Sequence, residues 1–98
     1  MKQISHARFQ YLTRSSELIA HNGKWRRDIL QSLYLTSTGR VYLKIENNWR
    51  GQCDKYFAVE LSELEGLEVA YFSGAWNREP KFNELLRAQI ERKEEQIA

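Results

Sequence analysis

Across residues 36–72 the chain alternates apolar and polar side chains with a period of two, the spacing of a β-strand with one buried face. In the clearest run, Val41, Leu43 and Ile45 fall on one face and the intervening side chains on the other. Two later runs repeat the pattern and an earlier run leads into it, which predicts strands at about 29–36, 40–46, 54–61 and 67–73. We therefore expect an α+β fold built on a four-stranded antiparallel meander.

Residues 5–22 fit either a helix or a hairpin. Ser5 is a suitable N-cap, and a helix over about 5–21 would end at Asn22-Gly23, where glycine accepts the left-handed backbone conformation. Residues 7–11 also alternate as a strand does, and Asn-Gly is a strong hairpin turn, so the hairpin remains an alternative. The helix is the prediction that we carry forward.

Pro80 predicts the start of an amphipathic C-terminal helix over about 80–96, because the first turn of a helix does not use the N–H that proline lacks. Its peptide bond with Glu79 should be trans. Apolar side chains then recur at helical spacing and should dock the helix. This stripe consists of Phe82, Leu85, Leu86 and Ile90, beyond which it thins and the last turns should fray or project.

The face of the meander opposite the expected core carries aromatic side chains. Tyr56 and Phe72 fall on that face, and without a covering helix they would form an exposed aromatic strip of the kind that marks a partner surface. A helix on each side of the sheet would remove this signal. The link over residues 62–66 is expected to be a short turn or a single helical turn.

Composition narrows the class of protein. A chain of 98 residues with 42% hydrophobic side chains suits one domain spanning residues 1–98 around one core. The longest apolar runs cover only a few residues and the start of the chain has no secretory pattern, so we expect a cytoplasmic protein. Cys53 is the single cysteine, which rules out an internal disulfide.

Sequence motifs of catalysis and of cofactor binding are missing. The five glycines are scattered singly, which argues against a phosphate-cradling loop, and no zinc-type spacing of cysteine and histidine is present. Cys53 would act as a nucleophile only beside a base such as His6 or His21, and nothing in their spacing suggests that pairing. We therefore expect a protein that is not an enzyme and that has no cofactor and no metal.

The net charge of +2 hides an asymmetry between the two halves of the chain. Residues 1–50 carry nine basic and three acidic side chains, whereas residues 51–98 carry six basic and ten acidic ones. A basic half suits contact with nucleic acid or with an acidic protein surface. The two halves can equally neutralise one another inside the folded domain.

Aromatic and basic residues together form the most informative pattern. Each of the three tryptophans lies in a turn-like segment next to arginine, and these two residue types are the most enriched at binding hot spots. The structural alternative is that each tryptophan seals an end of the core with arginine stacked on its ring. The candidate partner-binding residues are Lys24, Trp25, Arg26, Arg27, Trp49, Arg50, Trp76 and Arg78.

These observations lead us to expect a non-catalytic protein-binding module. In general character, though in no residue pattern, it is similar to the small accessory proteins of phages and mobile elements that inhibit or modulate host nucleases, recombination complexes or defence enzymes. The alternative is a nucleic-acid-binding domain that uses the basic N-terminal half, with bases stacked on tryptophan and arginine contacting phosphate.

Overall fold

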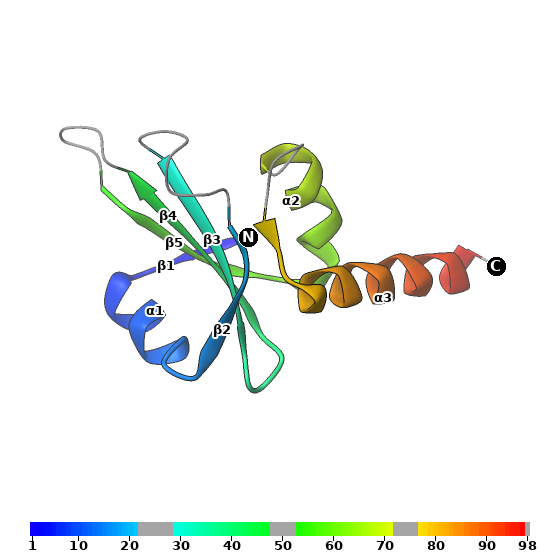
Figure 1. Ribbon diagram of the computed structural model, residues 1–98, viewed down its shortest axis with the longest axis horizontal. Helices are drawn as coiled ribbons and strands as arrows, with labels where there is room; N and C mark the ends of the chain where they lie inside the picture. Colours follow the sequence, from blue (N-terminus) through cyan, green and yellow to red (C-terminus); the bar gives the residue numbers. More distant parts are fainter. Residues whose placement is uncertain (22–28, 48–52, 72–76, 98) are drawn as a thin grey trace.

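The computed structural model describes residues 1–21, 29–47, 53–71 and 77–97, and these form an antiparallel sheet with helices on both faces (Figure 1). The described strands form one six-stranded sheet in the order β1-β5-β4-β3-β2-β6. The α+β class is therefore confirmed, with six strands where four were predicted. In chain order the elements are β1 (Lys2–Ile4), α1 (His6–Leu12), β2 (Ser16–His21), β3 (Ile29–Thr36), β4 (Val41–Asn47), β5 (Lys55–Val59), a 3-10 turn (Leu61–Glu63), α2 (Leu64–Tyr71), β6 (Asn77–Arg78) and α3 (Pro80–Ile97).

The first three strands of the predicted meander are confirmed. Strands β3, β4 and β5 pair in sequence order, with Leu33 opposite Leu43 and Val41 opposite Val59. The β3–β4 turn places Gly39 at a φ of 84°, a conformation that glycine adopts without steric cost. These strands follow the alternation in the sequence, so the register agrees with the division between the two faces.

The predicted fourth strand at 67–73 is wrong over 67–71, because these residues belong to helix α2, and residues 72 and 73 lie outside the described residues. Leu64 and Leu67 are both buried, and their spacing of three residues places them on one face of a helix. The predicted turn over residues 62–66 is where this helical segment begins. The Glu60 N–H donates to Glu63 Oε1 at 3.1 Å, which satisfies a backbone group at the helical start, as in a capping box.

The predicted N-terminal helix over 5–21 is correct only in its first half. Ser5 caps α1 as expected, accepting a hydrogen bond from the Arg8 N–H at 3.2 Å. Helix α1 ends at Leu12, after which Thr13 Oγ1 donates to the Phe9 carbonyl at 2.7 Å and Ser16 Oγ donates to the Thr13 carbonyl at 2.6 Å. These side-chain hydrogen bonds compete with a continued helix. The chain turns and returns as strand β2, which pairs with β3.

Besides β2, two further strands were not predicted, and each of these lies at an edge of the sheet. Strand β1 pairs with β5, with Lys2 opposite Ala58. Strand β6 has only two residues, and Asn77 pairs with His21 of β2. The Glu79 N–H then donates to the Ile19 carbonyl at 2.9 Å, at the point where the register of β2 shifts. This bond fixes the chain beside the sheet immediately before α3 begins.

Hydrophobic side chains pack on both faces of the sheet. Helices α2 and α3 lie on the face that holds the larger cluster, with Leu33, Leu43 and Phe82 at its centre (Figure 1). Helix α1 lies on the opposite face, where Phe9 contacts the Tyr56 ring with 4.8 Å between ring centroids. Tyr56 is therefore buried, and because a helix covers this face, the exposed aromatic strip expected for an uncovered sheet does not form at this residue. Phe72, its proposed companion, lies outside the described residues.

Helix α3 docks through its first turns and then extends away from the sheet (Figure 1). Pro80 is its first residue, and the peptide bond before it is trans, as predicted. Phe82 is fully buried, but Ile90 is 38% exposed, so the prediction that Ile90 helps to dock the helix is wrong. Lys93 pairs with Glu65 of α2 at 2.8 Å. None of the described helices is both long and apolar enough to cross a membrane.

Candidate partner-binding surface

The pairing of the strands brings the boundaries of three connecting segments to one end of the sheet. His21 precedes the segment 22–28 and pairs with Asn77, the residue that follows the segment 72–76. Ile29, where β3 begins, pairs with Asn47, after which the segment 48–52 starts. Lys55 begins β5 and pairs with Ile45 two residues before the end of β4. We call the part of the molecule bounded by these residues the Trp–Arg end.

The three tryptophans of the chain all belong to the segments that meet this end. Trp25, Trp49 and Trp76 lie in segments 22–28, 48–52 and 72–76, respectively. Seven of the eight candidate residues therefore lie outside the described residues, namely Lys24, Trp25, Arg26, Arg27, Trp49, Arg50 and Trp76. The sequence pattern alone does not show how these segments are arranged. The sheet shows that segments far apart along the chain start or finish side by side.

Arg78 is the candidate residue that the structure describes. It lies in β6, is half-buried, and its guanidinium carbon lies 5.6 Å from the centre of the Phe82 ring. A cation over an aromatic face contributes roughly 0.5–1 kcal/mol at an exposed site. Phe82 anchors α3. The contact of Arg78 with the Phe82 ring is therefore structural, which is the alternative role considered above for the arginines beside tryptophan.

Electrostatically, the Trp–Arg end is basic. Residues 22–28, 48–55 and 72–78 together carry six basic side chains and two acidic ones. Lys44 lies further along β4, on the face covered by α1, and pairs with Glu46 at 2.6 Å. The hydrogen bond that the Lys44 ammonium donates to Glu46 raises the pKa of Lys44, against the opposing effect of partial burial. This nearby pair is internally neutral, and the segments 22–28, 48–52 and 72–76 themselves carry four basic side chains and one acidic one, so most of the excess positive charge belongs to them.

The possible nucleophile and bases of the sequence, Cys53, His6 and His21, lie on separate segments of the fold. His6 stacks on Tyr56, with 5.0 Å between the ring centroids, on the face covered by α1. His21 lies at the end of β2, and Cys53 is exposed before β5. No group of three or more potential metal ligands comes together among the described residues.

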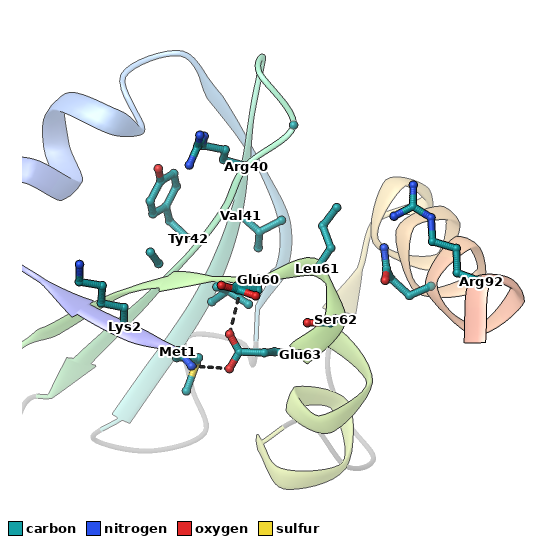
Figure 2. A pocket seen from close by; sticks show the side chains of 14 residues that line it. Met1, Lys2, Arg40, Val41, Tyr42, Glu60, Leu61, Ser62, Glu63 and Arg92 are labelled. Carbon is teal, nitrogen blue, oxygen red and sulfur yellow. Dashed lines mark hydrogen bonds and ion pairs between the residues drawn. The ribbon is translucent and has the colours of Figure 1, made fainter. Parts of the chain in front are cut away.

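A second surface feature, at the opposite end of the sheet, was missed in the sequence. An open groove of about 710 Å³ lies where β4 begins and β5 ends, between the sheet and α3 (Figure 2). Three basic side chains line it, from β1, the β3–β4 turn and α3: Lys2, Arg40 and Arg92. No sequence motif links three cations separated by so many residues, so only the fold could reveal the groove.

Comparison of the chain with models of protein families, with curated proteins and with solved structures found no match, so the case for a function rests on the surfaces described above.

Proposed function

We propose that this domain is a non-catalytic module that binds a larger protein through the Trp–Arg end. The observation that supports the proposal is the strand register, which sets the boundaries of three tryptophan-bearing segments side by side. Tryptophan and arginine are the residues in which binding energy concentrates at protein interfaces, and hot spots cluster near the centre of an interface. Three separate pairs in the sequence then become parts of one surface.

Chain connectivity limits how far these residues can lie from the sheet. Trp76 directly precedes Asn77, and Trp49 is two residues from Asn47. Trp25 is four residues from His21, which keeps it within roughly 14 Å of that residue even in a fully extended chain. Strands β6, β2, β3, β4 and β5 span about 19 Å at the usual interstrand spacing. These dimensions fit within one partner's share, about 800 Å², of an interface of standard size.

We further propose that the partner is an enzyme complex that this small domain occludes or modulates. Inhibitory accessory proteins of phages and mobile elements act in this way on host nucleases, recombination complexes or defence enzymes. The support is the small size of the chain, the absence of catalytic motifs from the sequence and the grouping of the tryptophan segments. A basic surface would favour a partner with an acidic face.

The excess of six basic over two acidic side chains also favours a second candidate function, binding of single-stranded nucleic acid. Bases would stack on the indole rings and arginine would contact phosphate. The two candidates differ in their response to salt, because phosphate contacts release counterions and make affinity fall steeply as salt increases.

Affinity capture with the full chain, followed by titration of the captured partner, tests the proposal. Trp25→Ala and the double change Arg26→Ala/Arg27→Ala should each weaken binding by about 1–3 kcal/mol, while folding stability changes by less than about 0.5 kcal/mol. Matched controls are Tyr11→Ala, an exposed aromatic residue on α1, and Arg87→Ala, an exposed arginine on α3. Both should bind as the unaltered domain does.

Single-stranded oligonucleotides provide the competing measurement. If nucleic acid is the ligand, the double arginine change should flatten the slope of log affinity against log salt by about two units. If Trp25→Ala instead unfolds the domain and the arginine changes affect no binding, these residues belong to the core and its rim. The proposed interface would then be wrong.

A further inference from the structure

We propose that the groove at the other end of the sheet binds an acidic peptide segment of a protein partner. It is lined where β1 and β4 begin and where β5 ends, whereas the Trp–Arg end lies where β4 ends and β5 begins. The two surfaces share no residue. This inference therefore stands independently of the function proposed above.

The charges in the groove are unequally compensated. The Met1 amine and the Glu60 N–H both donate to Glu63, so the Glu63 carboxylate is already paired (Figure 2). By contrast, Lys2, Arg40 and Arg92 form no ion pair with any residue that the structure describes. The lining therefore holds these three cations and, besides Glu63, one carboxylate, that of Glu60. An anionic ligand would relieve this imbalance.

The cations are distributed around the groove, which favours a ligand with separated charges. Figure 2 shows Lys2, Arg40 and Arg92 at different places around the groove, with the half-buried apolar side chain of Leu61 between Arg40 and Arg92. A single phosphate or carboxylate placed against one cation would leave the others unpaired. A peptide with carboxylates on both sides of an apolar residue matches the sequence of charge, apolar surface and charge across the groove.

Polar groups in the lining also suit a peptide backbone. Ser62 and Gln89 supply a hydroxyl and an amide that can donate to or accept from peptide groups. The single aromatic residue of the lining, Tyr42, is buried beneath α1, so the groove offers no exposed ring on which a base could stack. The Glu60 carboxylate would moreover repel a continuous phosphate backbone, whereas a peptide can place an uncharged residue opposite it. These features favour an acidic peptide over nucleic acid.

Fluorescence anisotropy with a labelled glutamate-rich octapeptide that has a central leucine tests this proposal on the full chain. We expect the peptide to bind with a dissociation constant below about 1 mM in roughly 0.15 M salt. Arg40→Gln and Arg92→Gln should each weaken binding about 2- to 5-fold, as expected for loss of one exposed charged contact. The matched control is Arg87→Gln, an exposed arginine of α3 outside the groove, which should change affinity less than about twofold.

Further probes separate this site from general attraction between opposite charges. The same octapeptide with glutamine in place of glutamate should not bind, and amide NMR signals should shift at Gly39, Val41 and Ser62 rather than at His21. The proposal is overturned if the acidic peptide does not bind, or if Arg87→Gln weakens binding as much as Arg92→Gln. It is also overturned if an oligothymidine binds more tightly than the peptide and loses affinity through the same groove substitutions.

Discussion

Truncating the apolar stripe of α3 residue by residue should produce a steep gradient in stability. Phe82 is fully buried in the core, Leu86 is half-buried, and Ile90 is 38% exposed. Removal of a fully buried aromatic side chain costs about 3–5 kcal/mol, so Phe82→Ala should approach that range. Because Leu86 is only half-buried, Leu86→Ala removes less buried area and should cost about 1–2 kcal/mol. Ile90→Ala removes the least buried area and should cost about 0.5–1 kcal/mol.

Urea titration of each variant measures this gradient as a change in the free energy of unfolding. Because small domains are stable by only about 5–15 kcal/mol, Phe82→Leu should accompany Phe82→Ala in case the latter fails to fold. Ala88→Gly, at an exposed position of α3, is the control for helix formation and should cost up to about 1 kcal/mol. Equal costs at Phe82 and Ile90 would refute the inference that only the first turns of α3 are docked.

Three further predictions test local features of the fold. Gly39→Ala should destabilise the domain by about 1 kcal/mol or more, because the φ of 84° at this position is unfavourable for alanine. Gly66→Ala should instead stabilise the domain by about 0.5–1 kcal/mol, because Gly66 lies inside α2 with open space around it. Urea midpoints of the two variants in the opposite order would contradict this prediction. The Met1 amine, followed by the Glu60 N–H, lowers the pKa of Glu63, so its contribution to stability is present above about pH 4.3 and is lost as the pH falls through the lowered pKa. The stabilities of Glu63→Gln and the unaltered domain should therefore converge in acid, and a constant difference would be inconsistent with this pairing. Burial, as the largest cause, raises the pKa of Tyr56, so stability should fall as the pH rises above about 10, and Tyr56→Phe should reduce that loss in an alkaline unfolding series.

The central strands could be predicted from the sequence because their side chains alternate over enough residues to exclude a helix. Over residues 67–71 the same alternation was misleading, since Leu64 and Leu67 also have helical spacing and a capping interaction at Glu63 starts a helical segment. Local periodicity in so short a run does not distinguish the two structures. The helix is selected by the packing of Leu64 and Leu67 against the core, and this tertiary contact cannot be read from the sequence pattern.

The edge strands and the groove could not be predicted because both depend on contacts between distant parts of the chain. Strand β6 has two residues, too few for any periodicity, and it forms only because β2 offers an edge. Arg40 and Arg92 carry no motif in the sequence, and they line one groove only once α3 is docked on the sheet. The tryptophan–arginine pairs were visible in the sequence, but only the strand register shows that the boundaries of their segments lie at one end of the sheet.

Paramagnetic relaxation enhancement most directly tests the central claim that the three tryptophan segments belong to one surface. Cys53 is the single cysteine and is exposed beside the Trp–Arg end, so it accepts a nitroxide label without any substitution. If the three segments form one surface, this label should broaden the indole N–H signals of Trp25, Trp49 and Trp76. In the Cys53→Ser background, a label on Ser62→Cys, at the groove, should leave all three signals much less affected. The claim would be contradicted by an indole signal that keeps its intensity with the label on Cys53 and loses it with the label at position 62.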